Sequence, residues 1–109
     1  MIPSHYRAMW LIAMFDLPVT SKSARKKATD FRALLLDTGF MMLQYSVYGR
    51  FCESADSVDS KIRTIRSQLP SEGSVRLLSV TDRQFAKMQH YTGKKRVNTE
   101  DPPDQLLLF

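Results

Sequence analysis

The fold is decided by the stretch Met9-Trp-Leu-Ile-Ala-Met-Phe-Asp16, in which seven apolar residues run into one carboxylate. A short run that is apolar at every position predicts a central strand covered on both faces. Side chains alternate along a strand, so Trp10, Ile12 and Met14 share one face, and Asp16 lies on that face at the exit of the strand. The proline two residues later has no N–H to donate, and regular pairing should therefore stop near Asp16.

Asp16 has two interpretations at this point. A carboxylate that follows a central strand is well placed for chemistry. Aspartate is also an ordinary turn residue, because its side chain bonds readily to nearby backbone. The neighbouring sequence does not decide between the two.

The length of 109 residues and the 43% hydrophobic content predict one domain with a single core. Such a small module should gain its function by association. Cys52 is the only cysteine, which excludes an internal disulfide and a cysteine-built zinc site, and we interpret it as a small buried side chain. The sequence shows no secretory signal pattern and no apolar run near the roughly 20 residues of a membrane span, so we expect a cytoplasmic protein without a membrane partner.

The net charge of +5 is concentrated in the second half of the chain, where residues 61–96 include nine basic and two acidic side chains. This bias favours a polyanionic partner, because neutralised phosphates release counterions and so supply affinity. The alternative is a basic surface that only aids solubility. The basic residues expected to contact nucleic acid are Lys22, Arg25, Lys26, Arg50, Arg76, Arg83, Lys87, Lys94, Lys95 and Arg96.

The remaining elements follow from capping residues, apolar spacing and β-forming composition. A helix should begin after Thr20 or Ser21 and end at Gly39, and a second should begin after Ser54 or Asp56 and end before Pro70. We expect the other strands at 40–43, 46–51 and 75–80. The order strand, helix, strand, strand, helix, strand predicts an α+β, ferredoxin-like βαββαβ sandwich with a four-stranded antiparallel sheet and both helices on one face.

The other face of this sheet has no predicted cover within residues 1–91, the expected core. An open apolar face is unfavourable for a monomer, so Trp10, Ile12 and Met14 are predicted to form a dimer interface. Residues 92–104 are polar and contain prolines, which predicts a flexible linker. Residues 105–109 should add as an extra strand to a sheet edge of the dimer or of a partner. The interface residues in that strand are Leu106, Leu107 and Leu108.

Two further groups of residues have more than one interpretation. The segment 81–91 should form a short helix or turn with Phe85 and Met88 packed inward, and His90 is a candidate general acid or base that lacks a partner in the sequence. Tyr45, Tyr48 and Phe51 are either packing residues of the sheet or a platform on which bases stack, as in generic RNA-binding modules of this fold.

The chain resembles the CRISPR-associated Cas-two family, the smaller partner of the Cas-one integrase in spacer acquisition. The residues that carry the resemblance are Phe15-Asp16-Leu17, Gln44-Tyr-Ser-Val-Tyr-Gly-Arg50 and the basic ferredoxin-like body, over roughly residues 10–80. The linker and the Leu-Leu-Leu ending look most like members from type II CRISPR systems.

The resemblance implies a homodimer in which the two copies of Asp16 approach each other and share a weakly bound Mg²⁺, which suits carboxylate oxygens and retained waters. It implies two competing functions. In the first, the dimer bridges integrase dimers and holds the duplex DNA of a protospacer by its backbone. In the second, it is a Mg²⁺-dependent endonuclease that cleaves RNA or DNA at the Asp16 pair, an activity attributed to some members and dispensable for acquisition in others.

Overall fold

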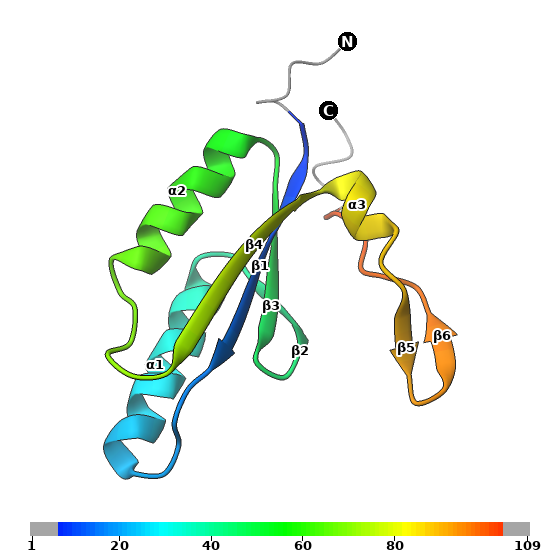
Figure 1. The fold of residues 1–109 in the computed structure, drawn as a ribbon. Helices are drawn as coiled ribbons and strands as arrows, with labels where there is room; N and C mark the ends of the chain where they lie inside the picture. Colours follow the sequence, from blue (N-terminus) through cyan, green and yellow to red (C-terminus); the bar gives the residue numbers. More distant parts are fainter. Residues whose placement is uncertain (1–6, 104–109) are drawn as a thin grey trace.

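The computed structural model describes residues 7–103 and shows a four-stranded antiparallel sheet with two long helices on one face (Figure 1). The strands lie in the order β2-β3-β1-β4, so β1 is an inner strand and β2 and β4 form the outer edges. The predicted α+β, ferredoxin-like arrangement is confirmed. The elements are β1 (Met9–Asp16), α1 (Lys22–Asp37), β2 (Met41–Gln44), β3 (Val47–Cys52), α2 (Ala55–Arg66), β4 (Ser74–Thr81), α3 (Asp82–Ala86), β5 (His90–Thr92) and β6 (Lys95–Val97).

The two long helices begin and end where their local signals predict. The Ser21 hydroxyl accepts a hydrogen bond from the backbone N–H of Ala24, and Ser54 caps α2 in the same way through Ser57. Gly39 follows α1 with φ of 94°, a left-handed conformation that glycine adopts without strain. Ending α1 here turns the chain directly into β2.

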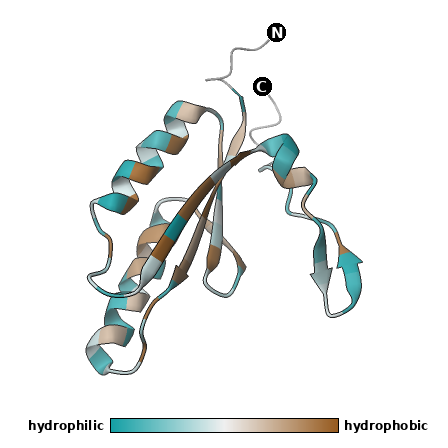
Figure 2. Cartoon of the chain, viewed as in Figure 1, coloured by the Kyte–Doolittle hydropathy of each residue, from teal (hydrophilic) through white to brown (hydrophobic). Residues whose placement is uncertain are grey.

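The helix-facing side of β1 forms the main core. Leu11, Ala13 and Phe15 are buried there with Phe31 and Leu35 of α1. The aromatic rings of Phe15 and Phe31 meet edge to face, with centroids 5.2 Å apart. Figure 2 shows the matching pattern, in which the central strands carry long hydrophobic stretches and the outer turns of both helices are hydrophilic.

The opposite side of β1 is covered in part by the chain itself, which corrects one prediction. The ring of Phe85 in α3 stacks on Trp10 with centroids 4.1 Å apart, and the Trp10 indole N–H donates to Asp82 Oδ1 at 3.0 Å. Trp10 is only 1% exposed and Ile12 only 9%. Both were expected to lie at a dimer interface, but neither has the free surface for it because α3 already covers them.

The strands β2 and β3 correct the proposed stacking platform. Tyr48 is 4% exposed and packs against Phe15 in the main core, whereas Phe51 is 7% exposed and packs against Trp10 on the other face of the sheet. The two rings therefore point in opposite directions and are both covered. Of the three residues, Tyr45 alone is exposed, at the turn between β2 and β3.

The C-terminal region contains more regular structure than predicted. Residues 92–104 were expected to form a linker, but β5 and β6 pair as a hairpin that projects beyond α3 (Figure 1). Its two-residue loop begins with Gly93 at φ of 62°, as hairpin turns of the primed types require. Phe85 is buried as expected, whereas Met88 is 43% exposed. The predicted docking strand at 105–109, with Leu106, Leu107 and Leu108, lies outside the described residues.

Candidate functional site

Asp16 is the last residue of β1, and its backbone is held on both sides. It pairs in register with Ser74 of β4, while the N–H of the preceding Phe15 donates to the carbonyl of Ser46 at 3.1 Å. The Asp16 side chain is exposed. The sequence therefore places an accessible carboxylate at a well-fixed point between the β2–β3 turn and the start of β4.

Gly73 allows the loop before β4 to cross close to this point. Its φ is 89°, and a Cβ at this position would lie 2.6 Å from the backbone oxygen of Asp16. A side chain would push the loop away from the end of β1, because Cβ atoms essentially never approach backbone oxygen so closely. The sequence offered no sign of this contact beyond the presence of a glycine.

A divalent cation would find only part of its ligands here. Within residues 7–103 no three acidic, histidine or cysteine side chains gather into a metal-binding group. Mg²⁺ prefers a few carboxylate oxygens and keeps several waters, so one exposed carboxylate per chain suits such an ion only if a second chain brings another. The donor set at Asp16 is thus compatible with the predicted shared Mg²⁺ site, and within residues 7–103 it forms no group of three ligands from one chain.

The back face of the sheet, opposite the two long helices, stays open at the Asp16 end. Met14, which pairs in register with Val47 on one side and Arg76 on the other, is half-buried. Leu78 is 50% exposed and Arg76 is also exposed. This open part of the back face, made by Met14, Val47, Arg76 and Leu78, combines three apolar side chains with one basic side chain, and Leu78 pairs with Ile12 in the middle of β1.

The predicted nucleic-acid contacts do not form one surface. Lys22, Arg25 and Lys26 lie on α1, on the helix side of the sheet. The others occupy the opposite side: Arg76 on β4, Arg83 and Lys87 in and after α3, and Lys94, Lys95 and Arg96 on the hairpin. These nine side chains are exposed. The longest basic run, at the hairpin, is also the part that stands farthest from the body in Figure 1.

Arg50 is the exception among the basic residues. Its guanidinium donates to the carbonyl of Thr38 at 3.2 Å and also to the carbonyl of Phe51, and the side chain is half-buried. It thus satisfies a carbonyl at the end of α1, where cationic groups are favoured by the helix dipole. This structural role uses Nε and Nη1 of the guanidinium, so fewer donors remain for a phosphate.

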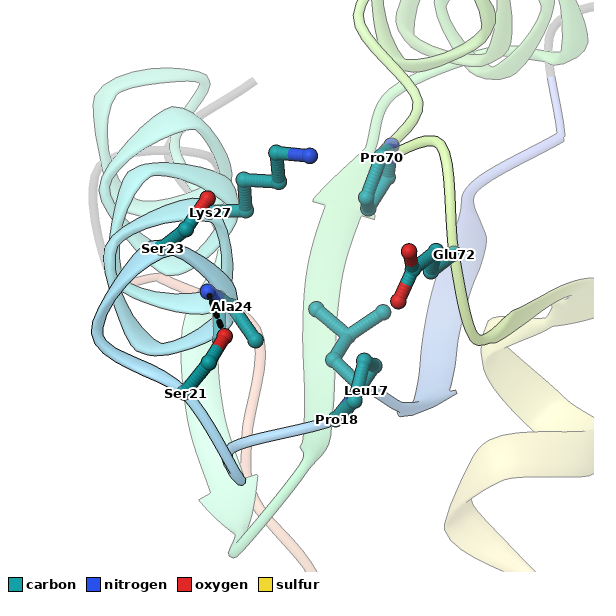
Figure 3. Close-up of a pocket in the computed structure, with 9 residues that line it drawn as sticks. Leu17, Pro18, Ser21, Ser23, Ala24, Lys27, Pro70 and Glu72 are labelled. Carbon is teal, nitrogen blue, oxygen red and sulfur yellow. Dashed lines mark hydrogen bonds between the residues drawn. The ribbon is translucent and has the colours of Figure 1, made fainter.

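A shallow pocket lies beside the exit of β1, between the start of α1 and the loop that leads into β4 (Figure 3). Leu17 and Pro18 line its base, and Lys27 and Glu72 face it from opposite sides. The Lys27 ammonium donates to the Ser71 hydroxyl at 3.3 Å. Because one cation and one anion offset each other, this pocket does not favour a phosphate group.

Two other candidates from the sequence lie apart from Asp16. His90 begins β5 on the hairpin, and its buried Nδ1 has no hydrogen-bond partner among residues 7–103. Its role as a general acid or base stays a prediction. Cys52 is fully buried, and burial raises the pKa of its thiol, opposed by a hydrogen bond from Ser57. Its interpretation as a small packing residue is confirmed.

A pair that the sequence did not connect joins α1 to the β2–β3 turn. Arg32 Nη2 donates to the Tyr45 hydroxyl at 3.3 Å, and its Cζ lies 5.6 Å from the centroid of the tyrosine ring. The two residues are thirteen positions apart in different elements. No local spacing rule could have paired them.

Fold and site together define a class: a small ferredoxin-like protein with a solvent-exposed carboxylate at the end of an inner strand and a basic exterior. The chain belongs to the CRISPR associated protein Cas2 family, whose model matches residues 9–88. This confirms the family that the sequence resembled.

Three relatives named "CRISPR-associated endoribonuclease Cas2" match nearly the whole chain. The Flavobacterium psychrophilum protein is 42% identical over 97% of this chain and 92% of its own length. The Parvibaculum lavamentivorans protein is 46% identical over 93% of this chain and all of its own length. The Paracidovorax avenae protein is 46% identical over 95% of this chain and 96% of its own.

In the described part of this chain, no helix is long and apolar enough to cross a membrane.

Proposed function

We propose that this protein is a Mg²⁺-dependent endonuclease that acts as a homodimer, with Asp16 of each chain as the metal-binding and catalytic residue. The observation that carries the proposal is the position of Asp16: its carboxylate is exposed while its backbone is fixed by β4 and by the β2–β3 turn. The names of the relatives support an endonuclease, and they specify RNA as the substrate of those proteins.

Asp16 would hold the ion together with Asp16 of a second chain, and retained waters would complete the coordination. When bound, the ion supplies a water of lowered pKa and neutralises charge on a phosphodiester. The protein positions the carboxylate. Because the backbone of Asp16 is already fixed, little conformational entropy is lost when the ion binds.

The open part of the back face supports the dimer. Met14 and Leu78 are apolar side chains with free surface on the same face of the sheet as Asp16. Met14 lies two residues before Asp16, and Leu78 pairs with Ile12 in the middle of β1. Contact between two such surfaces would bring two Asp16 carboxylates to the same region. Among the described residues, the outer strands β2 and β4 each have one unpaired edge, and residues 105–109 are proposed to add to such an edge.

The test replaces Asp16 with asparagine, which keeps size and polarity and removes the charge. Removing even a residue that only orients a metal ligand costs about 10- to 100-fold, so removal of a direct ligand should lower Mg²⁺-dependent cleavage of single-stranded RNA by at least about 100-fold. Asp59→Asn is the matched control, because Asp59 is an exposed carboxylate on α2. Equal cleavage by both variants would refute the role of Asp16.

A second function is favoured by the exposed basic hairpin: the dimer bridges two Cas-one-type integrase dimers and holds duplex DNA by its phosphates. Lys94, Lys95 and Arg96 are all exposed and stand together at its tip and on β6. All three residues are changed to glutamine. The slope of log affinity for duplex DNA against log salt concentration should then become less steep by about 0.9 for each phosphate that the hairpin neutralises in the native protein. An unchanged slope would exclude the hairpin from duplex binding, and intact spacer acquisition by Asp16→Asn would separate this function from cleavage.

A further inference from the structure

The β2–β3 turn, which is hydrogen-bonded to the end of β1, presents an exposed aromatic ring. Tyr45 is 75% exposed, the largest exposed fraction among the large hydrophobic side chains of the described residues. The next residue, Ser46, accepts the hydrogen bond from the N–H of Phe15, which directly precedes Asp16. The turn is thus fixed to the end of the strand that carries the carboxylate.

The Tyr45 ring is held in place although it is exposed. Arg32 reaches it from α1, with Nη2 donating to the phenol oxygen at 3.3 Å and Cζ 5.6 Å from the ring centroid. A guanidinium at this distance from an aromatic ring is attracted to it. Within residues 7–103 Arg32 has no carboxylate partner, so its charge remains available to an anion.

The backbone of the turn is strained in a way that fits a binding role. Ser46 has φ of 63° and is the one non-glycine residue with positive φ in the described part of the chain. Serine adopts this left-handed region at a cost, and such strain persists where the surrounding structure fixes it. Here it fixes the direction in which the chain presents Tyr45 and the Ser46 carbonyl.

We infer that Tyr45 and Arg32 form a subsite for one unpaired nucleotide at the β2–β3 turn. The tyrosine ring would stack on the base, and the Arg32 guanidinium would neutralise the adjoining phosphate. Both are positioning residues, and the subsite rests on the proposed function in that the strand it binds is the one that Asp16 would cleave. Because a base inside a duplex offers no free face for stacking, the subsite selects single-stranded nucleic acid.

Binding should be measured without cleavage, in the full-length Asp16→Asn protein. The probe is a short single-stranded RNA that carries 2-aminopurine, whose fluorescence is quenched when it stacks on an aromatic ring. Tyr45→Ala should weaken binding about 5- to 150-fold, the range for loss of one stacked base, and should abolish the quenching. Tyr45→Phe keeps the aromatic ring, so it should keep both the affinity and the quenching.

Two more variants separate stacking from charge and from fold. Met42→Ala alters a 57% exposed side chain on β2, next to the same turn, and should leave binding unchanged. Arg32→Ala should lower the salt slope for single strands by about 0.7, the value for one phosphate, and Arg32→Lys should restore it.

The outcomes distinguish this inference from the proposed function. Unchanged affinity and quenching in Tyr45→Ala would overturn the subsite, and so would an equal loss for duplex and single-stranded probes. A native protein that binds and quenches the probe through Tyr45 but does not cleave it would refute the endonuclease and leave the subsite standing.

Discussion

Replacing Phe85 with alanine should be the most damaging single change on the back face of the sheet. Phe85 is 4% exposed and stacks on Trp10 with 12° between the ring planes. With Ile12 and Phe51, these two rings make up the whole buried cluster on this face among the described residues. The contact decides whether α3 covers the sheet.

The expected loss is about 3–5 kcal/mol, the usual cost of truncating a buried phenylalanine to alanine. Of this loss, about 0.5–1.5 kcal/mol comes from the stacking of the two rings, in addition to the hydrophobic energy of the surface they bury. Phe85 is the buried side chain of α3. Two hydrogen bonds also hold α3: the Trp10 indole N–H donates to Asp82 Oδ1, and the Asp82 backbone N–H donates to the carbonyl of Ala8, just before β1. A domain of this size has about 5–15 kcal/mol of stability in total, so the melting temperature should fall by roughly 10–20 °C.

Trp10 makes the measurement direct because it is the only tryptophan. Denaturant unfolding followed by its fluorescence gives the free energy, and the native emission of Phe85→Ala should shift to the red as water reaches the indole. Met88→Ala is the control, since Met88 is 43% exposed and follows the same helix; its cost should stay within about 0.5 kcal/mol. A loss below about 1 kcal/mol with unchanged emission in Phe85→Ala would refute the covering role of α3.

Two more predictions concern local backbone and burial. Gly73→Ala should lower the free energy of unfolding by more than about 2 kcal/mol, because its Cβ would lie 2.6 Å from the backbone oxygen of Asp16. Gly93→Ala should lower it by only about 1 kcal/mol, because Gly93 also has a positive φ but nothing lies within 4 Å of its Cβ position. Equal costs in denaturant unfolding would contradict the close approach. Burial raises the pKa of Cys52, so the native thiol stays neutral while the unfolded one ionises near 9.0. The stabilising contribution of the neutral thiol is therefore present below pH 9 and is lost as the pH rises above it. Between pH 8 and pH 10, Cys52→Val should lose less unfolding free energy than the native protein. Identical pH profiles of the two proteins would disprove this.

The elements that the sequence predicts correctly are those with local signals. The apolar run of β1 gives its alternation, and Ser21 and Gly39 give the ends of α1, since caps act within one helical turn. The strand-end position of Asp16 follows from the same alternation. These signals depend on neighbours in the chain, so they hold without knowledge of the tertiary fold.

The errors concern contacts between distant residues. Trp10 and Asp82 are 72 positions apart, and no periodicity links them, so the cover over the back face could not be expected. The alternation of side chains along β3 gives the face of the sheet on which Tyr48 lies. It does not reveal that Tyr48 is buried, because that depends on contact with Phe15 of β1. The hairpin is different: Gly93 in a two-residue loop is a local signal, which the basic and proline-containing composition around it obscured.

The position of α3 also constrains the proposed dimer. Since Phe85 of α3 covers Trp10, and Ile12 is buried in the same cluster, two sheets cannot meet along the full back face. The free apolar surface there includes Met14 and Leu78. A contact of this size is small, and small interfaces are usually weak. The proposed Mg²⁺ site uses both chains, because Asp16 belongs to no group of three metal-binding side chains within the described residues. Metal binding and dimer formation should therefore strengthen each other, so that Mg²⁺ promotes the dimer and dilution lowers cleavage per chain more steeply than it lowers the binding of single strands.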